Sequence, residues 1–192
     1  MTKLRLAIAG ADTVLGSELC ARCPHSPAGC CVAPPRYDWS DLARVVRHGF
    51  RDWLVEHVAE GDLVPNANGL TIKRPKGRLT NDPGAPRFSR CTFHTAEKGC
   101  TIDERQRPAT CNFYLCDSAL GDADDRAGAR RAREVHDELV ARFVEWDRVL
   151  AERVREWPVE DRYGARFFDW LAEEAAKVGA LEESRSAHIA KK

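Results

Sequence analysis

The sequence has neither an excess of charge of one sign nor a long apolar run. Its 30 Lys and Arg residues balance 30 Asp and Glu residues. Proteins that bind nucleic acid usually carry a basic excess, so this balance argues against nucleic acid as a partner. No apolar stretch approaches the ~20 residues of a membrane-spanning helix, and we therefore expect no membrane association. With 43% hydrophobic and 31% charged residues, the composition is that of an ordinary globular protein.

The N-terminal segment lacks the features of a signal peptide. Lys3 and Arg5 are basic, but the apolar stretch after them ends at Asp12, short of the ~7–15 residues of a hydrophobic signal region. Cys20 does not fit a lipoprotein site, because bulky Leu19 precedes it where a small residue is expected. We therefore expect a cytoplasmic protein. Disulfides are rare in that reducing compartment, so the eight cysteines are better interpreted as a metal or redox site.

The glycine pattern near the N-terminus falls short of a dinucleotide-binding motif. A predicted strand at residues 4–8 is followed by a turn between Gly10 and Gly16. Asp12 and Leu15 occupy the positions of the motif's second and third glycines, and Cys- and Pro-rich turns come next instead of a βαβ unit. We therefore interpret this segment as a structural strand and turn.

Residues 38–60 have the clearest helical periodicity. Their apolar positions follow the i, i+3, i+4, i+7 pattern of one helix face. Asp38 or Ser40 can cap the start of the helix, and Gly61 can end it. His57 lies at the apolar edge, and we expect it to be packed or half-exposed rather than a ligand.

The segment after this helix combines a loop with a hairpin. Residues 62–90 are rich in Pro, Gly and Asn and are expected to be loop, apart from a strand-like run at 70–73. Residues 90–103 predict a β-hairpin, because two short runs of β-forming residues flank a polar turn. Such a hairpin would place Cys91 and Cys100 near each other.

The rest of the chain has helical patterns. A short helix beginning at Pro108 would carry Cys111 and project Cys116 about one and a half turns later. Residues 123–157 then predict a long helix that a proline ends, and residues 165–178 predict a second helix that a glycine ends. Both helices bear an apolar stripe and need a partner surface.

These elements together predict one α+β domain over residues 1–192. Its N-terminal half would be loop-rich and metal-stabilised with a small β-hairpin, and its C-terminal half would be helical. We place a cysteine-cluster core at residues 17–118, a helical extension at 119–180 and a polar tail at 181–192. The helical half also offers a surface for a protein partner.

All eight cysteines fall into two groups. The first group contains Cys20, Cys23, Cys30 and Cys31, and the second contains Cys91, Cys100, Cys111 and Cys116. The C-x2-C pair has the spacing of a metal knuckle, in which a tight turn directs two sulfurs at one point. Neighbouring side chains diverge in extended backbone, so we expect Cys30 and Cys31 to serve different partners. These partners are either two metals, or one metal and a packing or bridging role.

A metal ion or cluster would bring the two groups together by neutralising their thiolates. Four thiolates around Zn²⁺ or an oxidised [4Fe–4S] cluster leave a net charge of about −2. Basic residues near the cysteines can offset this charge. They are Arg22, Arg90, Arg105 and Arg107. His25 or His94 could replace a cysteine as a ligand.

The arrangement of these residues resembles that of the zinc- or iron-chelating cysteine-cluster proteins, the CxxCxxCC domain family. The hallmarks of that family are a C-x2-C…CC group, an acidic helix start, a hairpin of the form C-x-F…G-C-x-I, and R-P-x-x-C before an aromatic residue. In this chain they are Cys20, Cys23 and Cys30-Cys31, Trp39-Ser-Asp-Leu-Ala-Arg44, Cys91-Thr-Phe93, Gly99-Cys-Thr-Ile102 and Arg107-Pro-Ala-Thr-Cys111-Asn-Phe113. The match covers positions 20–116, with a longer gap before the Cys pair and an additional Cys116.

The resemblance implies metal binding more firmly than any reaction, and it leaves open whether the chain is an enzyme. Flagellin lysine methylases are similar in cysteine pattern, and this similarity implies an iron–sulfur cluster. We therefore expect a [4Fe–4S] cluster with a redox or modification-related role; the alternative is a zinc-stabilised protein-interaction module without catalysis. Structural thiols, disulfides and a lone nucleophilic cysteine fit the arrangement less well. Polar candidates for catalysis at a metal are Tyr37, His94, Arg107 and Tyr114.

Overall fold

The computed structural model describes most of the chain. The described residues are 1–23, 29–32, 35–74, 76–77, 88–89, 91–95 and 98–179. Near the N-terminus, β1 (Leu4–Ala7) and β2 (Val14–Ser17) form an antiparallel hairpin through the 3-10 turn η1 (Gly10–Asp12). The predicted strand is confirmed and a turn follows from Gly10, but Val14–Ser17, which overlaps the predicted turn, is the second strand of this hairpin. The antiparallel pairing differs from a dinucleotide-binding unit, which begins with parallel strands.

The helix predicted over residues 38–60 is divided in two, so the prediction of one continuous helix is wrong. α1 (Trp39–Arg47) and α2 (Arg51–Ala59) are separated near Gly49, whose φ of 85° is a left-handed conformation that ends the first helix. The predicted start is confirmed, since Asp38 caps α1 within a capping box.

Part of the predicted loop after α2 is a second hairpin. β3 (Leu63–Asn66) pairs with β4 (Gly69–Ile72) in antiparallel register. The strand-like run expected at 70–73 is confirmed in position, but the expectation of loop before it is wrong. Pro65 weakens the sequence signal for β3, although proline is tolerated in a two-stranded sheet, where both strands are edges.

Two further hairpins have strands of two residues each. β5 (Lys76–Gly77) pairs with β6 (Phe88–Ser89), and β7 (His94–Thr95) pairs with β8 (Gly99–Cys100). The β7–β8 pair confirms the hairpin predicted over residues 90–103, with its paired residues closer to the turn than expected. Residues 78–87 and 90, which belong to the predicted loop, lie outside the described residues.

The helix predicted to begin at Pro108 ends sooner than expected. α3 (Ala109–Phe113) carries Cys111, and Pro108 is its N-cap. The backbone becomes extended directly after α3, and Cys116 is the N-cap of a separate helix, α4 (Asp117–Gly121). The prediction that a single helix projects both cysteines is therefore wrong, because the extended link redirects the chain between them.

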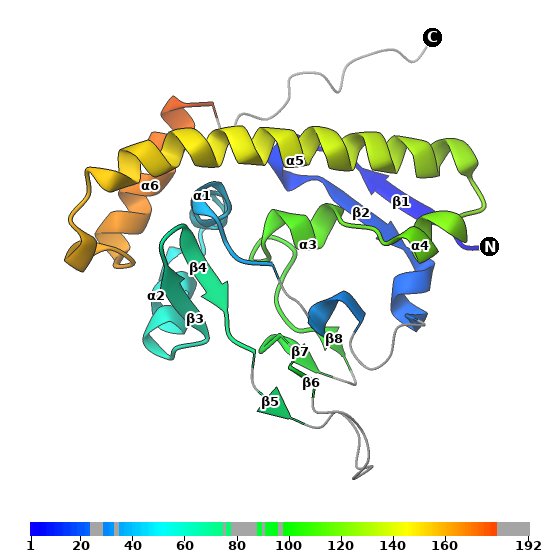
Figure 1. Ribbon diagram of the computed structural model, residues 1–192, viewed down its shortest axis with the longest axis horizontal. Coiled ribbons are helices and arrows are strands. Elements are labelled where there is room, and N and C mark those ends of the chain that lie inside the picture. The colour runs from blue at the N-terminus through cyan, green and yellow to red at the C-terminus, as the bar shows by residue number, and fades with distance from the viewer. Residues whose placement is uncertain are drawn as a thin grey trace.

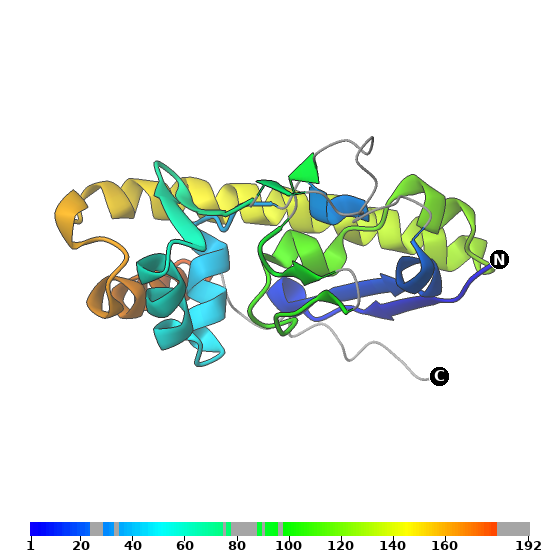
Figure 2. The same cartoon turned by 90° about the horizontal axis from the view of Figure 1, so that it is seen from below.

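The longest described helix is α5 (Arg126–Arg155), with 30 residues. In Figure 1, α5 runs along the full length of the molecule, and in Figure 2 the β1–β2 hairpin lies along one end of α5. The turn η4 (Val159–Asp161) leads into α6 (Ala165–Lys177), as predicted for a second helix. The predicted tail at 181–192 lies outside the described residues. No described helix is both long and apolar enough to cross a membrane.

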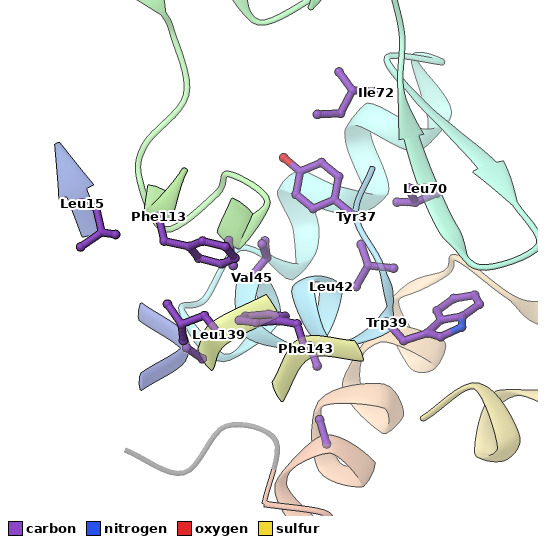
Figure 3. Close-up of a cluster of buried hydrophobic side chains, with 14 of the residues drawn as sticks. Leu15, Tyr37, Trp39, Leu42, Val45, Leu70, Ile72, Phe113, Leu139 and Phe143 are labelled. Atoms are coloured by element: carbon purple, nitrogen blue, oxygen red, sulfur yellow. The ribbon is translucent and has the colours of Figure 1, made fainter. Parts of the chain in front are cut away.

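Buried apolar side chains join the two halves of the chain. Figure 3 shows Val45 of α1 and Phe113 of α3 packed with Leu139 and Phe143 of α5. The Phe113 and Phe143 ring centroids are 5.9 Å apart. The helix that carries Cys111 is therefore anchored on the helical half. Hairpins and short strands in the N-terminal half with helices in the C-terminal half confirm the α+β class.

Candidate metal centre

The first cysteine group lies on or next to two 3-10 segments: Cys20 is in η2 (Glu18–Arg22), Cys23 is its C-cap, and Cys30 and Cys31 are in η3 (Gly29–Val32). Gly29 has a φ of 53°, and a Cβ atom at this position would lie 2.9 Å from the Sγ of Cys23. Glycine is required on both counts, because it adopts positive φ without strain and leaves room for the sulfur. The chain thus packs Cys23 against the backbone that leads directly into Cys30.

The two cysteine groups meet at a backbone hydrogen bond. The N–H of Cys91 donates to the carbonyl oxygen of Cys31 at 2.8 Å. Cys91 is buried and lies three residues before the β7–β8 hairpin, which ends at Cys100. In Figure 1, η3 is the dark blue turn beside β8. Two segments that are far apart in the sequence therefore bring Cys31 and Cys91 into backbone contact.

Neighbouring thiols in this region perturb one another. A hydrogen bond with Cys31 lowers the pKa of the Cys30 thiol to about 6, and the same bond raises the pKa of Cys31. Burial and then the charges of Cys30, Cys91 and Cys100 raise the pKa of Cys31 further. Burial, followed by the charge of Cys100, raises the pKa of Cys91 to about 11. All eight cysteines lie in the described ranges, and all are free thiols.

Cys111 belongs to the same neighbourhood although it sits on α3. The surrounding protein raises the pKa of its thiol chiefly by burial, and Cys100, Asp41, Cys91 and Cys30 raise it further by their charge. By surface area, however, Cys111 is exposed. Surface area decides whether a ligand can reach the sulfur, so we regard this thiol as crowded by protein and still accessible.

The remaining thiols form a second neighbourhood. Burial raises the pKa of Cys20, and the charges of Cys116, Cys30 and Cys23 add to this effect. Cys116, which is additional to the family pattern, therefore lies near the C-x2-C pair. Cys30 is a neighbour of thiols in both neighbourhoods. The expectation that Cys30 and Cys31 serve different partners stays a prediction.

The sulfurs are not held at the spacing of a zinc site. Four thiolates about 2.3 Å from a tetrahedral Zn²⁺ lie about 3.8 Å from one another. Within the described part of the chain, no three cysteine sulfurs lie within 4.8 Å of one another. An iron–sulfur cluster of four irons separates its thiolates more widely, because each sulfur binds a different iron.

Asp41 and Arg44 of α1 hold the segment that leads into α3. The Asp41 Oδ1 accepts a hydrogen bond from the Ala109 N–H at 2.6 Å, and the Arg44 Nη2 donates to the carbonyl oxygen of Arg107. Asp41 is 4% exposed and Arg44 1% exposed, and burial raises the pKa of Asp41 to about 6. The W-S-D-L-A-R and R-P-A-T-C motifs are therefore in direct contact, and α1 positions Cys111.

Of the two predicted histidine ligands, His94 lies among the described residues. It lies opposite Cys100 in the β7–β8 register, and its Nδ1 is buried without a hydrogen bond to any described residue. A buried nitrogen that lacks a partner is suited to a ligand role. His25 and Arg90 lie outside the described residues, and so does the side chain of Arg22.

The other predicted polar residues have partners within the fold. Arg105 forms an ion pair with Asp103 at 2.9 Å, and Arg107 donates from Nε to a backbone carbonyl at 3.1 Å. Tyr37 is fully buried and donates its hydroxyl to a backbone carbonyl at 2.7 Å, whereas Tyr114 is 45% exposed. These contacts explain the positions of the side chains, and a role in charge offset or catalysis stays a prediction.

Sequence reasoning missed two acidic sites. The Asp147 carboxylate accepts hydrogen bonds at 2.8 Å from both the N–H and the hydroxyl of Ser40. The second site contains His57, Glu60 and Asp62, whose ligand atoms all lie within 4.8 Å of one another. Its H-x2-E-x-D spacing at the end of a helix was the available sequence signal.

No family model, curated protein or solved structure matches this chain. The resemblance to the cysteine-cluster family therefore depends on the cysteine, hairpin and helix-start motifs alone. Any function has to be argued from the thiols and from the contacts that position them.

Proposed function

We propose that this chain is a cysteine-cluster metalloprotein that holds iron–sulfur clusters, one in each of two sets of thiols, for a redox or modification-related role. The observation that carries this proposal is the meeting of the two cysteine groups at the Cys91–Cys31 hydrogen bond, surrounded by thiols that perturb one another across the groups. Thiols gathered from separate segments are typical of a ligand set, whereas scattered buried cysteines have no reason to converge.

Two sets of four thiols would supply the ligands. One set is Cys20, Cys23, Cys30 and Cys116, and the other is Cys31, Cys91, Cys100 and Cys111. Around them, Gly29 admits the Cys23 sulfur, and Asp41 and Arg44 fix the segment that carries Cys111. When bound, an iron–sulfur cluster supplies one-electron redox chemistry.

The alternative is a zinc-stabilised interaction module without catalysis. Its specific support is a pair of exposed apolar side chains on α5, Val140 at 41% and Val144 at 64%, which a protein partner could cover. In the described part of the chain no three cysteine sulfurs lie within 4.8 Å of one another, so a tetrahedral zinc site would require the sulfurs to move together.

Anaerobic purification with metal and sulfide analysis tests the proposal against its alternative. We expect a brown protein with broad visible absorbance that dithionite bleaches, and iron and acid-labile sulfide in equal amounts. A colourless protein with stoichiometric zinc and no sulfide would overturn the iron–sulfur proposal in favour of the zinc module.

Single substitutions test the division into two sets. We expect Cys20→Ser and Cys111→Ser each to retain about half of the wild-type iron, since each removes one ligand from a different set. Thr110→Ala, an exposed neighbour of Cys111, is the matched control and should keep all of it. If one variant loses all of its iron and the other loses none, the protein holds a single cluster rather than two. Full iron in both would show that the wrong thiols have been joined.

A further inference from the structure

The last turn of α2 places a histidine next to two carboxylates, apart from the cysteines. The ring of His57 packs edge-on against Trp53, with centroids 4.6 Å apart, and against Phe93, with centroids 5.2 Å apart. These contacts confirm that His57 is packed, and the expectation that it is not a ligand stays untested. These aromatic contacts fix the orientation of the imidazole and leave its Nδ1 directed at the end of the helix.

The end of α2 brings both carboxylates to this nitrogen. Gly61 has a φ of 73°, its N–H bonds the Val58 carbonyl at 3.1 Å, and the Asp62 N–H bonds the His57 carbonyl at 3.0 Å. This pair of bonds is a Schellman motif, which turns the chain back across the helix end. Glu60 and Asp62 are therefore held beside His57 by the backbone.

The separations match those between ligands of one metal ion. The His57 Nδ1 lies 3.3 Å from the Glu60 Oε2 and 3.4 Å from the Asp62 Oδ2. Two ligands bound about 2.1 Å from one ion are separated by about 3.0–3.4 Å in octahedral or tetrahedral geometry. The nitrogen is buried, and it makes no aligned hydrogen bond to any described residue, so neither carboxylate satisfies it by a hydrogen bond.

The electrostatic surroundings favour a cation. Two carboxylates give the cluster a net charge of −2 when His57 is neutral, and the C-terminal end of a helix adds partial negative charge. The Thr92 hydroxyl donates to the Asp62 Oδ1 at 3.2 Å, which leaves the other oxygen of that carboxylate facing the histidine. Such an outer hydrogen bond is a common way of orienting a metal ligand.

We infer that His57, Glu60 and Asp62 form a binding site for a divalent first-row transition ion, with solvent completing the coordination. One imidazole nitrogen and two carboxylate oxygens suit ions such as Mn²⁺, Fe²⁺ or Zn²⁺. The donor set is chemically distinct from the thiolates, so the site is independent of the proposed iron–sulfur function. If these residues bind no metal ion, the same geometry serves only as an ion pair between a protonated His57 and the two carboxylates.

Mn²⁺ is a suitable probe because carboxylates bind it well, whereas soft thiolates select other metals. Free Mn²⁺ is measured by its electron paramagnetic resonance signal during titration of the full-length protein as purified. We expect one saturable site, with affinity at least about tenfold weaker in Glu60→Gln and in Asp62→Asn. Glu56→Gln, which removes an exposed carboxylate from the same helix, is the charge-matched control and should bind as the wild type does.

Nuclear magnetic resonance of the wild-type protein gives a readout that does not depend on folding of the variants. Bound Mn²⁺ should broaden the His57 ring signals before those of His136, which lies on α5. Equal affinity in all four proteins, no saturable binding, or His57 signals that persist at saturation would each overturn the inference. The last result, combined with an unchanged iron content, would leave the proposed function of the thiols intact.

Discussion

The helical region and the cysteine region are stabilised in different ways. In the helical region, Phe167, Phe168 and Leu171 of α6 are all 0% exposed, and the Trp157 and Trp170 rings are 4.7 Å apart. In the cysteine region, four of the eight thiols are exposed and only Cys91 is buried. Burial of apolar surface therefore accounts for the order of the first region, whereas the second presents reactive groups that a ligand would have to hold together.

Metal removal should have the largest effect and should act on one region alone. Binding of a structural metal contributes about 10–16 kcal/mol in small zinc domains, so if the thiols hold a metal as proposed, its loss should destabilise the segments that carry them. After anaerobic chelation, we expect hydrogen exchange to accelerate in η3 and β7–β8 while α5 and α6 keep their protection. Unchanged near-UV circular dichroism and protease resistance would show that the cysteine region is ordered without metal.

Phe167→Ala should destabilise the helical region and leave the metal content unchanged. Phe167 is fully buried and contacts the rings of Trp39, Trp157 and Tyr163, so truncation should lower the free energy of unfolding by about 3–5 kcal/mol in a urea titration. Iron per folded molecule should stay at the wild-type value. The control is Val144→Ala, at a side chain 64% exposed, which should change stability by less than about 0.5 kcal/mol. A loss of iron per folded molecule in Phe167→Ala would mean that metal binding in the cysteine region depends on apolar packing in the helical region.

The same contrast explains what could be predicted from the sequence. Long helices with an apolar stripe are determined by local periodicity, and α5 and α6 were predicted with ends close to those observed. The break between α1 and α2 was missed, because Gly49 interrupts an apolar pattern that continues on both sides. The β3 strand was missed because its four residues include a proline.

The candidate site was predictable as a set of residues but not as an arrangement. Cysteine spacing divided the eight thiols into two groups, and the predicted hairpin forms with Cys100 opposite His94. The expected nearness of Cys91 and Cys100 agrees with the effect of the Cys100 charge on the pKa of Cys91. The contact between Asp41 and the start of α3 joins residues 68 positions apart, which no local pattern encodes. The separation of Cys111 from Cys116 onto two helices depends on the extended backbone at Tyr114 and Cys116, which the sequence pattern did not predict.

Asp41→Asn tests the connection between the regions and should have an intermediate effect. The Asp41 carboxylate accepts from the Ala109 N–H and faces the buried Arg44, so loss of its charge leaves that guanidinium with a weaker partner. We expect a loss of about 1–3 kcal/mol in stability and a lower iron content, since Cys111 depends on this contact. Asp52→Asn, at a side chain 83% exposed, is the control. An unchanged iron content in Asp41→Asn would show that the Asp41 contact does not position Cys111.

The smallest effect is expected at Asp147, and it depends on pH. Burial raises the pKa of Asp147 to about 7, well above the value of 3.8 for an unperturbed carboxyl. Between these two values the unfolded chain ionises while the folded protein keeps its proton, so the stability from this group is lost as pH rises from about 4 to about 7. Asp147→Asn keeps an acceptor for both Ser40 donors and removes the ionisation. Because the site is partly open to solvent, we expect the free energy of unfolding of Asp147→Asn to exceed that of the wild type by on the order of 1 kcal/mol at pH 8 and to equal it at pH 4. A variant whose urea midpoints differ from wild type by the same amount at both pH values would contradict this assignment.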